Sequence, residues 1–224
     1  LFGILVGEQI VPFAKTLWSK EPAAISWIQQ SDVSSLFHAY PELEHLRIRG
    51  SNELSLGRIK HDKLKSLTIE TGGLPVSVIR EVFAAQLPAL EHLELWLGTD
   101  NYGWDGSIED LRPIFTGNLF PSLKYLGLRN SKVADAIATE LVSSPVLTRI
   151  EVLDLSLGTL SDDGGAALAG SEAVKKLRKL DLHYNFLSAE MQAKLQALPI
   201  EVDVDRSDTD PNADDDDRYV AVSE

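Results

Sequence analysis

From Leu177 to Leu187 the chain reads Leu-Arg-Lys-Leu-Asp-Leu-His-Tyr-Asn-Phe-Leu, and this stretch decides the fold. Leu180 and Leu182 alternate with polar residues, a pattern that predicts a short strand with one apolar face. Asn185 follows at a place where its side-chain amide can bond backbone groups as the chain leaves the strand. The stretch therefore predicts a strand and a turn. It predicts the fold of the whole chain only if the same pattern recurs.

The same apolar pattern recurs along the chain. Six copies start at Leu43, Leu64, Leu90, Leu123, Ile150 and Leu177. Successive starts are 21, 26, 33, 27 and 27 residues apart, and such near-regular spacing indicates an internal repeat. Residues 1–6 fit as a weaker, earlier copy, and residues 200–204 alternate like a last strand.

Units of this length leave room for a helix after each strand. Apolar residues with helical spacing occur within residues 33–40 and 134–142, and Pro75, Ser161 and Ser188 suit the first positions of further helices. Alternating strands and helices stack through right-handed crossovers. We therefore predict an α/β fold, a right-handed parallel β/α solenoid that forms a segment of a curved horseshoe, with the strands on its concave side.

The copies follow the L-x-x-L-x-L pattern of leucine-rich repeats, and the chain resembles a leucine-rich repeat protein of the ribonuclease-inhibitor-like type over roughly residues 1–204. Residues 25–32, 93–98, 180–183 and 218–224 resemble, more narrowly, a family of uncharacterised bacterial cytoplasmic leucine-rich repeat proteins. This resemblance implies a cytoplasmic bacterial protein without an established activity. It also implies that the chain is N-terminally truncated, because the relatives carry a further N-terminal region.

Composition excludes several classes of function. The net charge is −13, which argues against a nucleic-acid partner because such proteins usually carry a basic patch. Cysteine is absent, so neither disulfides nor thiolate metal sites are expected. No apolar run approaches the length of a transmembrane helix, and we expect no membrane partner. The remaining partner class is a protein or a peptide, and the oligomeric state is left open.

The third, fifth and seventh residues of each copy are predicted to face the concave side of the sheet. Solenoids typically bind on that side, and aromatic residues and arginine dominate interface energetics. The alternative is an ordinary solvated sheet face with a few exposed aromatics. The predicted partner-binding residues on this face are Arg47, Arg49, His92, Glu94, Trp96, Tyr125, Arg129, Asp154, Asp181 and His183.

The longest unit contains an insertion at residues 98–107 that is rich in glycine. Insertions in repeat proteins form loops, often on the binding face. We therefore add Tyr102 and Trp104 to the predicted partner-binding residues. The alternative is that Trp104 folds back to cover the edge of the solenoid.

Candidate catalytic and metal sites are weak. Ser156, Asp154 and His183 come nearest to a triad, but no oxyanion donor is evident. His45 and His92 lie two strands apart, about 10 Å, which is too far for one zinc ion, and His183 is farther still. We predict no catalytic residue, no metal and no cofactor, and hence no enzyme.

Residues 201–224 hold ten acidic and two basic residues. We divide the chain into a repeat solenoid, residues 1–204, and an acidic C-terminal tail, residues 205–224, which is expected to be partly disordered. The alternating end at residues 219–222 could dock onto an exposed edge of its own chain or of a partner.

These observations predict a non-enzymatic protein–protein interaction module, which binds a protein or peptide on the concave face and the 98–107 loop. One alternative is an accessory or regulatory subunit of an enzyme, with the chemistry in a missing N-terminal region or in a partner. Another is an accessory protein that uses its acidic tail as an electrostatic handle.

Overall fold

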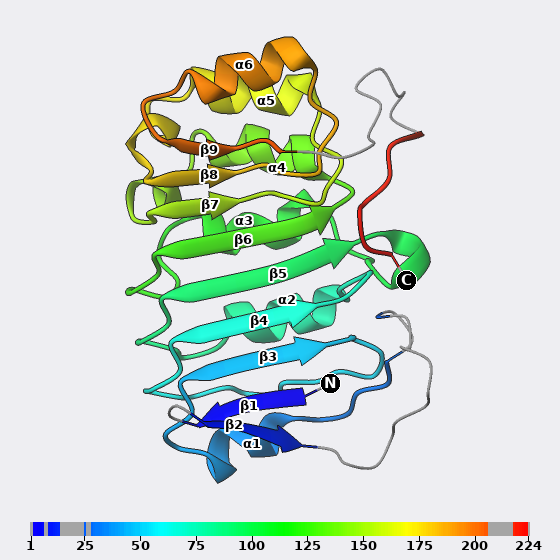
Figure 1. Ribbon diagram of the computed structural model, residues 1–224. Coiled ribbons are helices and arrows are strands. Elements are labelled where there is room, and N and C mark those ends of the chain that lie inside the picture. The colour runs from blue at the N-terminus through cyan, green and yellow to red at the C-terminus, as the bar shows by residue number, and fades with distance from the viewer. Residues whose placement is uncertain (1, 7–8, 14–24, 26–27, 206–216, 224) are drawn as a thin grey trace.

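The computed structural model describes residues 2–6, 9–13, 25, 28–205 and 217–223. Its framework is one nine-stranded sheet in the order β2-β1-β3-β4-β5-β6-β7-β8-β9 (Figure 1). Seven strands are mutually parallel, and each pairs with the next strand in the sequence. They are β3 (His45–Arg49), β4 (Ser66–Glu70), β5 (His92–Gly98), β6 (Tyr125–Ser131), β7 (Val152–Asp154), β8 (Lys179–Asp181) and β9 (Glu201–Asp203).

Each connection from β4 onward contains an α-helix, whereas residues 50–65 between β3 and β4 form none. Helices α2, α3 and α4 lie behind the sheet in the view of Figure 1. Within the described residues the α-helices are α1 (Ser34–Ala39), α2 (Val76–Phe83), α3 (Ile108–Phe115), α4 (Ala134–Leu141), α5 (Asp162–Gly170) and α6 (Ala189–Gln196). Short 3-10 helices occur at Asp100–Tyr102, Pro145–Thr148 and Val174–Lys176. The chain thus builds an open α/β sheet by adding one strand and its connection at a time, an arrangement that fits a β/α solenoid.

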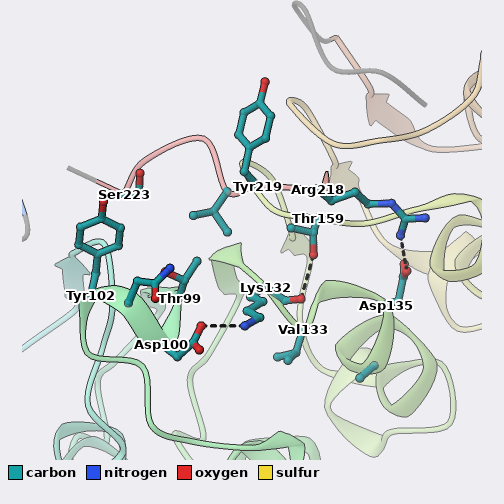
Figure 2. A pocket seen from close by; sticks show the side chains of 13 residues that line it. Thr99, Asp100, Tyr102, Lys132, Val133, Asp135, Thr159, Arg218, Tyr219 and Ser223 are labelled. Atoms are coloured by element: carbon teal, nitrogen blue, oxygen red, sulfur yellow. Dashed lines mark hydrogen bonds and ion pairs between the residues drawn. The ribbon is translucent and has the colours of Figure 1, made fainter. Parts of the chain in front are cut away.

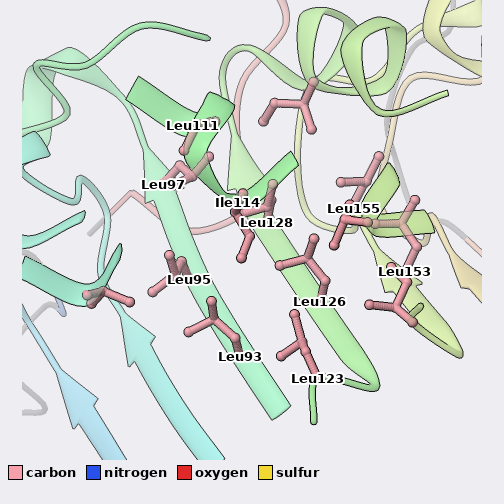
Figure 3. Packing of buried hydrophobic residues seen from close by; sticks show 14 of the residues in the cluster. Leu93, Leu95, Leu97, Leu111, Ile114, Leu123, Leu126, Leu128, Leu153 and Leu155 are labelled. Carbon is pink, nitrogen blue, oxygen red and sulfur yellow. The ribbon is translucent and has the colours of Figure 1, made fainter. Parts of the chain in front are cut away.

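The predicted leucine register is confirmed. One leucine from each copy pairs with its equivalent on the neighbouring strand, and all of them are almost fully buried. Figure 3 shows three of them, Leu93, Leu126 and Leu153, in the core. Burying such a side chain contributes roughly 1.5–3 kcal/mol. The paired residues are Leu46, Leu67, Leu93, Leu126, Leu153 and Leu180.

Local signals at the helix starts act as expected. The side chains of Ser161 and Ser188 accept hydrogen bonds from the amides of Asp163 and Met191 and so cap α5 and α6. Helix α3 was not predicted, although Ser107 and Asp110 form a capping box at its start. Asn185 bonds the backbone in the predicted way, because its Oδ1 accepts from the amide of Leu160 and its Nδ2 donates to two carbonyls.

The prediction that residues 1–6 form an earlier parallel copy is wrong. Strand β1 (Phe2–Val6) runs antiparallel to β3 and forms a hairpin with β2 (Gln9–Phe13). The length of the connection explains why β1 and β2 are antiparallel to each other, because parallel neighbours would need a crossover of a dozen or more residues. Only residues 7 and 8 separate β1 from β2.

The C-terminal end returns to the sheet. Residues 217–223 run beside the carboxyl ends of the parallel strands, seen in red in Figure 1. Most of the acidic run, residues 206–216, lies outside the described residues, so its predicted disorder stays a prediction.

Candidate functional site

The face of the sheet opposite the helices, called the open face below, carries the side chains that the register predicts. His92 pairs with Tyr125, and Trp96 pairs with Arg129, on the adjacent strands β5 and β6. Asp154 and Asp181 are paired in the same way on β7 and β8. The third and fifth positions of successive copies therefore form continuous rows, as the sequence indicated. The seventh positions pair between β3 and β4 and between β5 and β6.

Glu94 is the centre of these rows. Its Oε1 accepts hydrogen bonds from Nε1 of Trp96 at 2.7 Å and from Nη1 of Arg129 at 3.0 Å, and its Oε2 lies 3.3 Å from Nε2 of His92. Burial alone would raise the pKa of Glu94, but the hydrogen bonds from His92 and Trp96 and the charge of Arg129 lower it to about 2. Glu94 is therefore an ionised carboxylate at neutral pH, with only 10% of its side chain exposed.

Asp154 forms a second buried acceptor beside it. The hydroxyl of Tyr125 donates to Asp154 Oδ2 at 2.6 Å, and Nε of Arg129 lies 3.3 Å from the same oxygen. Burial raises the pKa of the Tyr125 hydroxyl, and the charges of Asp154 and Glu94 raise it further. Tyr125 therefore stays protonated and acts as a hydrogen-bond donor.

Gly127 makes room for this arrangement. It occupies the fifth position between Glu94 and Asp154. A Cβ atom there would lie 3.0 Å from Cε1 of Tyr125 and 3.2 Å from Cγ of Glu94. The missing side chain lets the Tyr125 ring lie across β6 toward Asp154. The small residue thus permits two carboxylates to share the donors of one tyrosine and one arginine.

Aromatic rings complete the group that we call the sheet-face cluster. The rings of His92 and Tyr125 are stacked with centroids 3.9 Å apart, and the Arg129 guanidinium lies 5.2 Å from the centroid of the Trp96 ring. The cluster consists of His92, Glu94, Trp96, Tyr125, Arg129 and Asp154. Glu94 and Asp154 are buried within it and hold the aromatic and basic groups in place. Their contribution to partner binding stays a prediction.

Both ends of the open face carry further ion pairs. Glu70 is buried and pairs with Arg47 and, at 3.1 Å, with Nε of Arg49, while both arginines keep much of their surface exposed. At the other end Nδ1 of His183 lies 2.5 Å from Asp181 Oδ1. This hydrogen bond raises the pKa of His183 above its ordinary value, although burial by itself would lower that pKa.

Asp203 joins His183 and Asp181 in a group that sequence analysis missed. One ligand atom from each of the three lies within 4.8 Å of the others, which is compatible with a metal ion. Nζ of Lys179 already approaches the two carboxylates, at 3.2 Å from Asp181 and 3.9 Å from Asp203. Because this ammonium supplies the positive charge there, the group forms an ion-pair cluster without requiring a metal.

The nearest thing to a triad is not assembled. Oγ of Ser156 accepts from Nε of Arg129 at 2.8 Å, and its amide donates to Asp154. His183 is paired with Asp181 instead. The described contacts therefore give these residues roles within ion-pair networks.

The 98–107 loop lies at the edge of the sheet where the strands end. Trp104 is only 5% exposed and packs into the core, so it is not available as a partner anchor, and its alternative role as an edge cover fits the structure. Asp105 Oδ1 accepts from the amide of Val76 at 2.7 Å and so steadies the start of α2. Tyr102 is half-buried and reaches the cavity described next.

A cavity of about 750 Å³ lies at this edge, between the 98–107 loop and the C-terminal residues (Figure 2). Lys132 pairs with Asp100 at 2.7 Å on one wall, and Arg218 pairs with Asp135 at 3.5 Å on another. The sequence offered one weak signal for this site, the alternating residues 219–222. The cavity could not be predicted otherwise, because it forms between segments that are far apart in the sequence.

Comparisons with known proteins agree with the architecture. Residues 1–48 match a family described as a protein of unknown function, DUF1427. A crystal structure of a protein from Bacteroides fragilis, determined by a structural genomics consortium, is similar to this chain with a TM-score of 0.80 and 38% sequence identity. The similarity covers 84% of this chain and 54% of the Bacteroides protein, so the chain spans about half the length of that relative.

A search of curated proteins finds no match. Among the residues that the structure describes, no helix has the length and apolar character needed to cross a membrane.

Proposed function

We propose that the chain is a leucine-rich repeat module of the ribonuclease-inhibitor-like type that binds a protein or peptide partner on its open face. Six L-x-x-L-x-L copies and a sheet that gains one parallel strand per copy support this assignment. The resemblance to bacterial cytoplasmic repeat proteins supports a cytoplasmic location, in keeping with the absence of cysteine.

The observation that carries the proposal is the fixed position of Trp96. Its Nε1 is held by Glu94, and its ring faces Arg129, so the indole loses little further freedom when a partner covers it. Tryptophan, tyrosine and arginine are the residues that most often dominate binding energy. Arg129 and Tyr125 are themselves held by the two buried carboxylates. The sheet-face cluster is thus a preorganised platform with an aromatic group at its surface.

The test is cross-linking from the native cell, followed by mass spectrometry, with the parent chain and two variants. Trp96→Ala removes the indole from the open face. Arg112→Ala removes an exposed side chain from α3 on the opposite side and serves as the control. We expect Trp96→Ala to lose the partners that the parent and Arg112→Ala retain. An unchanged set of partners with the folded Trp96→Ala variant would show that the open face is not the binding surface.

A further inference from the structure

We propose that the edge of the sheet contains a second binding site, which recognises an extended peptide of the pattern Arg-x-Val-x-Val and is occupied here by the chain's own residues 218–222. We call it the edge groove and define it by Asn130, Asp135, Leu157 and Phe186, which contact that segment. The site is separate from the open face, and the proposal does not depend on the proposed function.

The groove binds the backbone of the segment through hydrogen bonds. Nδ2 of Asn130 donates to the carbonyl of Val222 at 2.5 Å, and the amide of Val222 donates back to Oδ1 of Asn130 at 2.9 Å. The amide of Ala221 donates to the carbonyl of Leu157 at 2.9 Å. One buried side chain thus satisfies both backbone groups of a single residue, as an added strand would. Such contacts suit any extended peptide and give affinity without sequence preference.

Repeat geometry places these groups in line. Asn130 and Leu157 occupy the eighth position of two successive copies, and both have a left-handed backbone, with φ of 52° and 66°. Tyr184, at the same position of the next copy, has φ of 56°. Equivalent turns therefore project along one edge of the sheet. The segment crosses them in order, with Tyr219 against Phe186 after β8, Ala221 at Leu157 after β7 and Val222 at Asn130 on β6.

Side chains supply the sequence preference. Val220 is only 3% exposed, whereas Tyr219 is 61% exposed, so alternate residues point toward the protein and away from it. Arg218 is largely buried and pairs with Asp135. That carboxylate is already fixed, because it accepts hydrogen bonds from the amide and hydroxyl of Ser161 at 2.8 and 2.7 Å. A basic residue followed two positions later by a small apolar one is therefore what the groove selects.

The resident segment leaves part of the site unfilled. The cavity of about 750 Å³ lies beside it, and Tyr102, Lys132 and Thr159 form its walls (Figure 2). Oγ1 of Thr99, on the same wall, is buried and has no hydrogen-bond partner within the described part of the chain. A peptide with a larger polar side chain at the Ser223 position, which lines the cavity, would fill this space better. The chain's own end is thus a weaker ligand that holds the site until such a peptide displaces it.

The tether explains how a weak ligand can hold the site. Residues 206–216 connect the last strand to the docked segment within one chain. A short linker of this kind gives an effective concentration in the millimolar range. An external peptide must compete with that concentration, so removing the internal competitor should raise its apparent affinity.

The experiment measures binding of a fluorescein-labelled peptide with the sequence of residues 218–224 to the full chain by fluorescence anisotropy. Val220→Asp in the protein places a charge where the segment is buried, so it releases the segment and leaves the groove intact. We expect Val220→Asp to bind the peptide at least tenfold more tightly than the parent chain. A peptide with aspartate at its own Val220 position is the matched control, and it should bind at least tenfold more weakly to the same protein.

Three results would overturn the proposal. They are equal affinity of the parent and Val220→Asp, no binding of the peptide to Val220→Asp at millimolar concentration, and equal binding of the matched and control peptides. Asn130→Asp, added to Val220→Asp, removes the donor to the peptide carbonyl and should reduce affinity at least tenfold. Because the peptide comparison uses one unchanged protein, it decides the question even if the Asn130 variant does not fold. A dimeric parent that becomes monomeric in Val220→Asp would overturn the intramolecular assignment.

Discussion

The sheet-face cluster and the edge groove are built in different ways. In the cluster, strand register brings side chains together, and two buried carboxylates hold Tyr125 and Arg129 from within. In the groove, turns of successive copies face a distant segment, and Asn130 bonds its backbone. The cluster is therefore part of what stabilises the fold, whereas the groove is a surface from which residues 218–222 can dissociate. Substitutions of the buried carboxylates should therefore lower the stability of the whole fold, whereas substitutions in the docked segment should only release that segment.

The largest effect is expected for Glu94→Ala. It leaves the buried Arg129 charge with fewer partners and removes the acceptor of Trp96 Nε1. Removing one member of a buried ion pair costs about 3–5 kcal/mol in the free energy of unfolding. Urea denaturation followed by circular dichroism measures this.

Glu140→Ala is the matched control, because Glu140 pairs with Arg112 at the exposed surface of the helical side. It should change the unfolding free energy by less than about 1 kcal/mol. Similar losses in both variants would mean that the cluster stabilises the fold no more than surface ion pairs do.

The pH dependence of the unfolding free energy tests separately whether the ionised Glu94 stabilises the fold. The pKa of Glu94 is about 2 in the folded protein and 4.5 for an ordinary glutamate. A lowered pKa stabilises the folded state fully above about pH 4.5, and this contribution is lost as the pH falls toward 2. It amounts to roughly 3 kcal/mol, because each pKa unit corresponds to about 1.4 kcal/mol.

Glu94→Gln keeps the shape of the side chain and removes its charge. The free energy of unfolding of this variant should fall less steeply between pH 5 and pH 2 than that of the parent, as measured by urea titrations at each pH. Parallel curves for the two proteins would show that Glu94 does not titrate with a lowered pKa.

The contrast between the two regions also explains what the sequence could predict. The period of L-x-x-L-x-L fixes which residues pair, so the rows through His92, Glu94 and Trp96 follow from the sequence alone. Burial within a row could not be predicted, because it depends on Gly127 letting Tyr125 lie across the strand. The pairing of Val222 with Asn130 joins residues 92 positions apart, and no periodic pattern connects them.

The hairpin of β1 and β2, at the other end of the chain, is a second feature that the periodic pattern could not predict. Residues 2–6 read Phe-Gly-Ile-Leu-Val, a short apolar run that is compatible with either strand direction. The short separation from residues 9–13 decides that β1 and β2 run antiparallel to each other. Periodicity identifies strands, and a short connection decides that the two strands it joins run antiparallel.

The smallest effect on stability is expected for Val220→Asp. The segment contributes one buried valine, three hydrogen bonds to its backbone and one ion pair, and its loss is offset by the chain freedom that it regains. The free energy of unfolding should fall by about 1 kcal/mol or less, while the amides of Ala221 and Val222 exchange with solvent far faster than in the parent. The exchange rates of the backbone amides of Leu93 and Leu126 in the core should rise only as far as the small decrease in the free energy of unfolding requires. If Val220→Asp instead destabilised the whole sheet as strongly as Glu94→Ala, the segment would be a structural element of the fold, and the groove would not be a site that another peptide can enter.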